Sequence, residues 1–365
     1  MARVHRWTGL FLAFWLFALA CSGVVLVFYD ELDHFLNQDL YSVEPGDASL
    51  MPAALVSAAT AAYPGAYVFE LDLPNGPDES ARLQLRPRKD AETAYAGRRE
   101  VFVDPYTGTV IGDRGYGEAK LDRRHLPGAI YQLHRNFLLG DPMLWFLGLV
   151  AVLWLGMQAV GVFLAFPRLK FWRKSFRIRK GATGIALFYD LHRSAGLWLL
   201  PVTLIAALTG LSFQWSGTFS AAVSFFSSVT PHHYSEARSL PEPVHAPPSA
   251  FDRAVSATQA TTKGAGIDRI RQLPDKGLLW VYSFDRRDIY EEGRRWTFVD
   301  VMDGRVVSDR HQAEGSVGDA FLAWQYPLHS GKALGWLGRM IVLCAGLAVL
   351  AGLVSGCVVW FRKRS

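Results

Sequence analysis

Cysteine is scarce in this chain of 365 residues. The three cysteines, Cys21, Cys344 and Cys357, all stand inside long apolar runs, and the hydrophilic segments between those runs contain none. A disulfide framework is therefore excluded. Buried apolar thiols are the expected state of all three side chains.

Charged residues are nearly missing from four stretches of the chain. Residues 7–29, 143–166, 194–215 and 334–361 contain no acid or base except Arg339. A helix of about 20 apolar residues crosses a hydrocarbon core of about 30 Å. The sequence therefore predicts four transmembrane helices. Because no acid or base lies in the middle of these stretches, a transporter is disfavoured.

Basic residues gather at three places that a four-helix topology puts on one side. The loop 167–180 has seven Lys or Arg and no acid, and both chain ends are basic. The positive-inside rule makes this side the cytoplasm, and the long hydrophilic segments then lie in a bacterial periplasm. These flanks explain the net charge of +5, so nucleic-acid binding has no support. A lipoprotein signal cleaved before Cys21 is the alternative for the first stretch, but the apolar run continues beyond that residue.

The two halves of the chain repeat each other. "HRWTGLF" at 5–11 returns as "HRSAGLW" at 192–198, an offset of 187, and "FVDPYTGTVIGDR" at 102–114 returns as "FVDVMDGRVVSDR" at 298–310. "YQLH" at 131–134 returns as "YPLH" at 326–329, and Gly161 and Phe166 match Gly356 and Phe361, all at an offset of 195. The common order indicates duplication of one unit. Each hydrophilic copy has one amphipathic helix followed by short alternating runs, which is typical of a small α+β domain.

A helix, short strands and a "VDPYTG" turn, tied to membrane helices with edge histidines, resemble the PepSY-associated transmembrane family. This family includes iron-regulated inner-membrane proteins and siderophore reductases of the ferrioxamine B reductase type. The predicted fold is a membrane α-helical protein with four transmembrane helices and two small α+β PepSY-like periplasmic domains. The expected segments are helix 1 (1–30), domain 1 (31–133), an outer-face histidine segment with helix 2 (134–166), a basic cytoplasmic loop (167–184), helix 3 (185–216), domain 2 (217–328) and helix 4 with a basic cytoplasmic tail (329–365).

Four of the ten histidines match between the repeats, and the topology places two at each membrane face. His5 and His192 are expected at the cytoplasmic face, and His134 and His329 at the outer face. Interfacial histidine is the structural alternative for any one of them. Zinc competes weakly, since each face offers two histidines and no cysteine, with Asp190 or Asp141 as loose helpers. Two facing imidazoles in an apolar slot are sufficient for a haem iron, and the family resemblance points the same way.

The sequence thus predicts two haems with these histidines as axial ligands. No CxxCH is present, so the haems are expected to be non-covalent, of the b type. Arg6, Arg135 and Arg193 each follow a ligand candidate and are expected to pair with haem propionates; membrane-flank charge is the alternative. His329 is followed by Ser330, leaving Lys332 or Arg339 as substitutes.

The resemblance implies a ferric-siderophore reductase. An unknown cytoplasmic or membrane donor would reduce the inner haem, and the outer haem would reduce a periplasmic ferric siderophore, a hydroxamate being the expected type. The arginine pairs at 98–99, 286–287 and 294–295 are candidates for holding an anionic chelate, with solvated strand edges as the alternative. The rival function is non-catalytic: periplasmic peptide or protein binding by PepSY-like domains that four helices anchor. The roles of His34, His232 and His233 are left open.

Overall fold

The computed structural model describes residues 1–91, 95, 97–166, 169–231 and 236–362. The chain divides into two compact units. The helical unit comprises Met1–Tyr29, Ile130–Ser227 and Phe321–Ser365, and the sheet unit comprises Asp30–Ala129 and Ser228–Ala320. Each unit therefore draws on both halves of the sequence.

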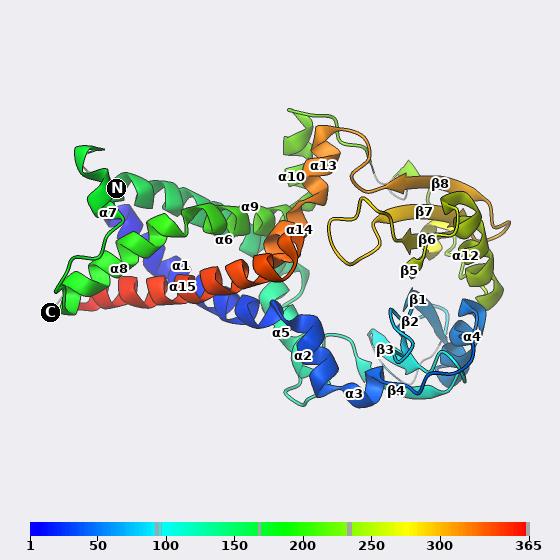
Figure 1. The fold of residues 1–365 in the computed structure, drawn as a ribbon. Coiled ribbons are helices and arrows are strands. Elements are labelled where there is room, and N and C mark those ends of the chain that lie inside the picture. Colours follow the sequence, from blue (N-terminus) through cyan, green and yellow to red (C-terminus); the bar gives the residue numbers. More distant parts are fainter. Residues whose placement is uncertain (92–94, 96, 167–168, 232–235, 363–365) are drawn as a thin grey trace. The chain divides into compact units, whose positions relative to one another are not determined.

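Long apolar helices form the helical unit (Figure 1). They are α1 (Ala2–Leu26), α6 (Asp141–Ala165), the successive helices α8 (Gly184–Trp198) and α9 (Leu200–Gln214), and α15 (Gly335–Arg362). Helix α1 packs on α6 and α15, α8 packs on α15, and α6 packs on α9. Shorter helices attached to this bundle are α5 (Leu126–Asn136), α7 (Trp172–Ser175), α10 (Ser216–Ser224), α13 (Val317–Ala323) and α14 (Gln325–Ser330).

Within the described part of the chain, three helices are long and apolar enough to cross a membrane: Ala2–Leu26, Asp141–Ala165 and Lys332–Arg362. The third predicted span is wrong as a continuous helix, because α8 and α9 meet at a bend of 66°. Pro201 lies in the first turn of α9, where a proline has no N–H to extend α8 and its ring would clash with the preceding turn. The count is four only if the bent pair forms one span.

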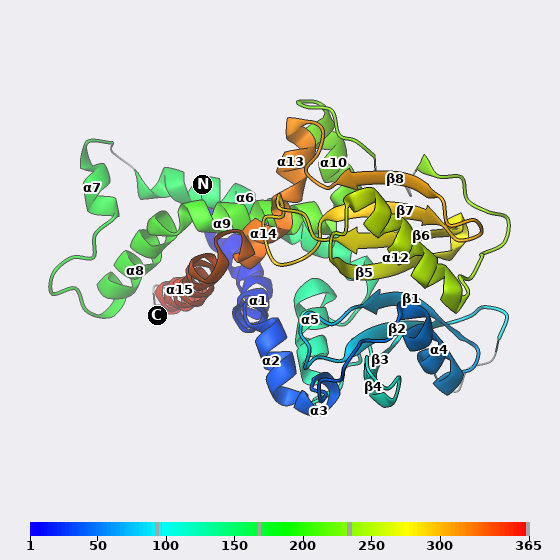
Figure 2. The same ribbon diagram turned by 45° about the vertical axis from the view of Figure 1, so that its right-hand side comes forward.

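One continuous sheet forms the second unit (Figure 2). Its eight antiparallel strands run in the order β4-β3-β2-β1-β5-β6-β7-β8. The first copy supplies β1 (Ala66–Asp72), β2 (Ala81–Pro87), β3 (Arg99–Val103) and β4 (Val110–Gly115), and the second supplies β5 (Ile267–Leu273), β6 (Leu278–Ser283), β7 (Arg295–Asp300) and β8 (Val306–His311). The two expected domains are thus two halves of one sheet.

The seam between the copies is the pairing of β1 with β5. Leu71 lies opposite Ile270, with Glu70 opposite Arg271 and Asp72 opposite Arg269. Alignment of the two copies by their matched "FVD" segments makes Val101 equivalent to Thr297. Val101 pairs with Leu83, which pairs with Leu71, and in the same way Thr297 pairs with Val281, which pairs with Ile270. Leu71 and Ile270 are therefore equivalent residues that face each other across a local two-fold axis.

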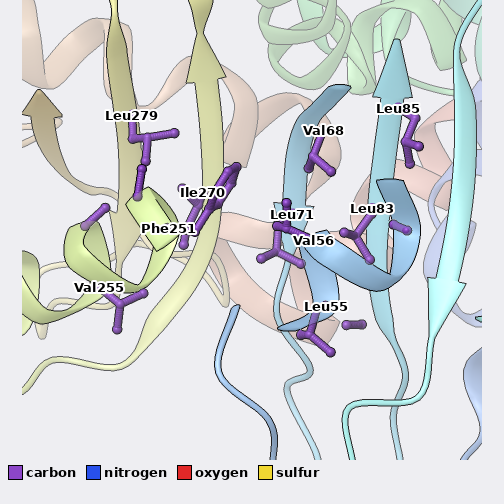
Figure 3. Close-up of a cluster of buried hydrophobic side chains, with 14 of the residues drawn as sticks. Leu55, Val56, Val68, Leu71, Leu83, Leu85, Phe251, Val255, Ile270 and Leu279 are labelled. Atoms are coloured by element: carbon purple, nitrogen blue, oxygen red, sulfur yellow. The ribbon is translucent and has the colours of Figure 1, made fainter. Parts of the chain in front are cut away.

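Two helices cover one face of the sheet, α4 (Pro52–Ala62) and α12 (Pro248–Thr262), and they pack on each other. Their apolar sides meet inward-facing strand residues from both copies in a single core (Figure 3). Fully buried members include Leu55, Leu71, Leu83, Phe251, Ile270 and Leu279. Because the core crosses the seam, the two copies are held together by apolar burial as well as by strand pairing.

A buried ion cluster ties α2 (Tyr29–Leu36) and α3 (Gln38–Tyr41) to the other face of the sheet. The Arg114 guanidinium donates to both oxygens of Asp33, at 2.6 and 2.7 Å, and to Glu100 at 2.6 Å. Burial alone would raise the pKa of Asp33, but the hydrogen bonds and charge of Arg114 outweigh it and hold that pKa below its ordinary value. All three side chains are almost completely buried, so removing one leaves buried charge without a partner.

We expect Arg114→Met to destabilise the sheet unit by about 3–5 kcal/mol, because Asp33 and Glu100 lose their shared cation. The measurement is hydrogen–deuterium exchange of β3 and β4 amides in the full chain, which should become faster by more than about 100-fold where exchange follows unfolding. The matched control is Arg88→Met, whose partner Asp90 is exposed, and it should leave the exchange rates of these amides unchanged because exposed ion pairs contribute little to stability. Equal exchange in both variants would contradict the assigned role of the cluster.

Candidate functional site

His134 and His329 face each other in the helical unit. His134 lies in α5 and His329 in α14, and their ring centroids are 6.2 Å apart with planes turned by 61°. When two imidazoles bind one metal from opposite sides through nitrogen at about 2.0 Å, their ring centroids lie about 6 Å apart. The separation of the two rings is therefore compatible with two ligands on opposite sides of one metal ion.

Hydrogen bonds fix which nitrogen of each of these rings is free. Nδ1 of His134 lies 3.0 Å from the Leu19 carbonyl and 3.0 Å from Ser22 Oγ, which itself donates to the Ala18 carbonyl. Nδ1 of His329 lies 2.7 Å from Thr209 Oγ1, which donates to the Ile205 carbonyl. Both hydroxyls therefore accept from Nδ1–H, which leaves the Nε2 lone pair of each histidine available to a metal.

His5 and His192 form the second pair, near the other end of the bundle. His5 lies in α1 and His192 in α8, with ring centroids again 6.2 Å apart and planes turned by 67°. Nδ1 of His192 lies 2.8 Å from the Gly352 carbonyl of α15, so it donates there and frees Nε2. Nδ1 of His5 is buried and has no hydrogen-bond partner among the described residues. The second pair thus has the same ring separation as the first, but only one of its two rings has a hydrogen bond at Nδ1 to a described residue.

A glycine faces each of the four histidines. A Cβ added at Gly23 would lie 3.0 Å from His134 Cε1, and one at Gly356 would lie 2.9 Å from His192 Cε1. At Gly161 and Gly210 the corresponding distances, to His5 and His329, are 3.6 and 3.9 Å. These glycines obey the same offsets as the histidines, 187 for 23 and 210 and 195 for 161 and 356. Each histidine ring thus lies close to the backbone of a glycine, where the side chain of a larger residue would approach the ring.

The donor set of each site is two imidazoles. Burial lowers the pKa of both His134 and His329 to about 4, so both are uncharged at neutral pH. Within the described ranges, no group of three or more His, Cys, Asp or Glu is placed to hold a metal ion. Structural zinc takes four protein ligands, whereas a haem iron brings four of its own and needs only two. The residues therefore fit a bis-histidine haem at each site.

The separation of the two sites can be read along α1. His5 lies at its beginning and Gly23, which contacts His134, lies 18 residues later, a rise of about 27 Å. Trp15 lies between them and packs on Phe14, Phe137 and Phe146 with ring centroids 4.7–5.1 Å apart. Trp198, the last residue of α8, is by contrast 68% exposed and donates to the Phe176 carbonyl.

The arginines expected at haem propionates have different surroundings. Arg193 donates to the carbonyls of Lys174, Ser175 and Arg177 and to Asp190, so it anchors the segment before α8. Asp190 is fully buried, and Arg179 also binds it; it is therefore no helper for a metal. Arg6 and Arg135 are exposed, and their pairing with propionates stays a prediction.

The two substitutes considered near His329 are also engaged. Arg339 donates twice to the Val27 carbonyl at the end of α1 and lies 4.9 Å from the Phe28 ring centroid. Lys332 Nζ lies 6.0 Å from the ring centroid of Tyr326. Arg339 therefore ties α15 to the end of α1.

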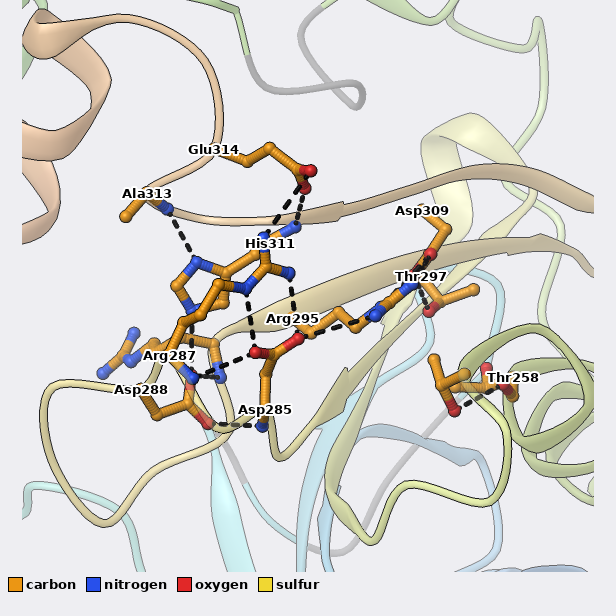
Figure 4. Close-up of polar contacts among 12 residues, drawn as sticks. Thr258, Asp285, Arg287, Asp288, Arg295, Thr297, Asp309, His311, Ala313 and Glu314 are labelled. Carbon is orange, nitrogen blue, oxygen red and sulfur yellow. Dashed lines mark hydrogen bonds and ion pairs between the residues drawn. The ribbon is translucent and has the colours of Figure 1, made fainter.

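Most of the arginines proposed for an anionic chelate are neutralised within the sheet unit. Arg287 pairs with Asp285 and Arg295 with Asp309 (Figure 4). Arg99 pairs with Asp113, and Arg294 with Glu292. Arg98 and Arg286 have no such ion pair among the described residues.

Two further histidines, His34 and His311, have structural surroundings. His34 stacks on Tyr41 with ring centroids 3.9 Å apart. His311 is buried, and its Nε2 lies 3.0 Å from Asp288 Oδ1. His232 and His233 lie outside the described residues.

Sequence reasoning missed the residues that orient the outer pair. Ser22, Gly23, Thr209 and Gly210 were not singled out, although "SG" at 22–23 returns as "TG" at 209–210 at the histidine offset of 187. That repeat was a usable signal. The carbonyls of Leu19 and Gly352 could not have been found in this way, because every residue supplies a carbonyl and only the packing selects one.

The comparison with protein families agrees with this architecture. The model of the PepSY-associated TM region matches residues 2–363, nearly the whole chain. The protein therefore belongs to this family of membrane proteins. No curated protein matches the sequence.

Proposed function

We propose that this protein is a di-haem b protein of a bacterial inner membrane that reduces periplasmic ferric siderophores. The observation that carries the proposal is the pair of facing histidines at each end of the bundle, both with a ring separation of 6.2 Å. A pure membrane anchor has no need for four such residues in repeat-matched positions. One pair alone would suit a metal store, but two pairs at separate positions along the bundle suit passage of electrons from one to the other.

His5 and His192 would hold one haem, and His134 and His329 the other. When bound, haem supplies reversible one-electron chemistry at iron. The chain's own contribution is to fix the imidazole tautomers through Ser22, Thr209 and the Gly352 carbonyl, and to leave room beside the rings at the four glycines. Donation from Nδ1–H also makes an imidazole a stronger ligand.

The direction of electron flow follows from the proposed topology. Residues 169–184, the N-terminal residues and Arg362 lie at the end of the bundle that holds His5 and His192 (Figure 1). These segments are basic, so the positive-inside rule would assign this end to the cytoplasm. A cytoplasmic or membrane donor would then supply the His5 and His192 site. The His134 and His329 site would deliver electrons to the periplasmic side, where the substrate is met.

A ferric siderophore is the proposed acceptor, by resemblance to the reductases of this family. Hard oxygen ligands bind ferric iron far more tightly than ferrous iron, so one electron loosens the chelate. The iron is reduced from the ferric to the ferrous state, and the siderophore leaves unchanged. A hydroxamate is the first substrate to try.

We expect the reduced, anaerobic protein to be reoxidised when ferrioxamine B is added with a ferrous-iron trap present. One ferrous ion should be trapped per electron lost, and His329→Ala should abolish both signals because its outer site is incomplete. His125→Ala is the matched control, since the His125 side chain pairs with Asp122 and Glu118 in the sheet unit. A reduced protein that stays reduced with hydroxamate, catecholate and carboxylate chelates would rule out the reductase assignment. Peptide or protein binding by a membrane-anchored sheet unit would then be the better function.

A further inference from the structure

Three arginines surround one phenylalanine on the face of the sheet that α4 and α12 do not cover. The guanidinium carbons of Arg86, Arg98 and Arg271 lie 3.2, 6.0 and 5.5 Å from the ring centroid of Phe69. Arg86 comes from β2, Arg98 directly precedes β3, and Arg271 comes from β5 of the other copy. The group, which we call the Phe69 arginine cluster, therefore lies where the two copies meet.

The cluster carries more positive charge than its neighbours neutralise. Arg271 is paired with Glu70. Neither Arg86 nor Arg98 has a carboxylate within 4.0 Å in the part of the chain that the structure describes. On the same face, by contrast, Arg82 pairs with Asp72, Arg114 with Asp33 and Glu100, and Arg269 with Asp72 and Glu292. Two guanidinium charges are thus left over in one small area.

Arg86 hydrogen-bonds the Tyr67 side chain but has no carboxylate partner in the described part of the chain. Its Nε is buried and has no hydrogen-bond partner among the described residues. Burial, together with the charges of Arg98 and Arg271, lowers the pKa of Arg86 below its ordinary value. An anion between the guanidinium groups would relieve this repulsion and accept the free donors. Arg98 is exposed, so the cluster can be reached from solvent.

We infer that the Phe69 arginine cluster binds the anionic oxygen atoms of the ferric chelate that this protein reduces. The inference rests on the proposed reductase function and narrows its substrate: negatively charged chelates, such as carboxylates, are preferred over the neutral or cationic hydroxamates. A guanidinium group binds the two oxygens of a carboxylate through two parallel hydrogen bonds, and the flat apolar ring of Phe69 packs against the guanidinium groups. Of the arginines suggested by the sequence, only Arg98 belongs to this cluster.

The test is the equilibrium binding of gallium citrate to the full-length protein in detergent, measured by calorimetry. Gallium replaces ferric iron but is not reduced under these conditions, so binding is measured apart from electron transfer. Arg86→Met and Arg98→Met should each weaken binding by about tenfold or more. Arg88→Met is the matched control, because Arg88 follows β2 directly and is already paired with Asp90, and it should bind like the parent. Arg98→Lys should recover part of the loss by restoring the charge.

Three results would overturn the inference: no loss in Arg86→Met and Arg98→Met, equal binding of the gallium complex of ferrioxamine B, or equal binding of citrate alone. Failure of the reductase proposal gives a different pattern. His329→Ala should bind gallium citrate with unchanged affinity even though it cannot reduce a chelate. Binding that survives while no chelate is ever reduced by the parent protein would overturn the reductase proposal and leave only an anion site.

Discussion

The protein purified from cells supplied with haem is expected to be red and to contain about two b-type haems per chain. His134→Ala or His329→Ala should each remove the same haem, and His5→Ala or His192→Ala should each remove the other, because a single imidazole is left at the affected site. The measurement is the Soret absorbance and the extracted haem per chain, which should fall by about half in every single variant.

Independence of the pairs is the informative part of this result. The double variant of His134 and His329 should retain one haem, whereas that of His5 and His134 should retain none. His125→Ala should keep both haems. A colourless parent protein with native secondary structure would end the electron-transfer proposal, and equal behaviour of His5→Ala and His134→Ala as partners would show that the pairing is wrong.

The second large effect is expected from glycines that contact the ligands. Gly356→Leu and Gly23→Leu should each cost one haem while all four histidines are kept, because the new side chain occupies the space of His192 or His134. Gly9→Leu on the same helix as Gly23, and Gly156→Leu in α6, are matched controls: an added Cβ meets nothing within 4 Å at either position. The measurement is the haem content per chain, determined from the absorbance of the pyridine haemochrome. Full haem content in Gly356→Leu would contradict the proposal that these glycines leave the space that the ligand histidines need, as would equal losses in Gly156→Leu.

The location of the histidine pairs could be predicted because duplication marks them twice. His5 with His192 and His134 with His329 keep their offsets, and the apolar runs fix which end of the bundle each occupies. The membrane helices followed equally directly from length and hydropathy for α1, α6 and α15. The break between α8 and α9 was missed because Pro201 stands in an uninterrupted apolar run, and prolines are tolerated in membrane helices.

The joining of the two copies into one sheet could not be predicted in this way. Strand β1 pairs with β2 on one side, and its other edge offers only backbone groups, which any strand can meet. The pairing of β1 with β5 joins strands that are far apart in the sequence, and it is favoured by the burial of Leu71 and Ile270 in a common core. The Phe69 arginine cluster was missed for the same reason, since Arg271 reaches it only across this seam.

The charge pattern at the seam distinguishes the two halves from each other. Across the local two-fold axis, Glu70 occupies the position of Arg269, and Asp72 occupies that of Arg271. Two copies of the first half would set Glu70 against Asp72, and two copies of the second would set Arg269 against Arg271; each half repels itself and complements the other. If the chain arose by duplication and fusion of a gene that encoded a homodimer, these positions diverged after the fusion, when each of the two strands paired with one different strand and no longer with a copy of itself. The divergence also disfavours exchange of like halves between neighbouring molecules in a crowded membrane.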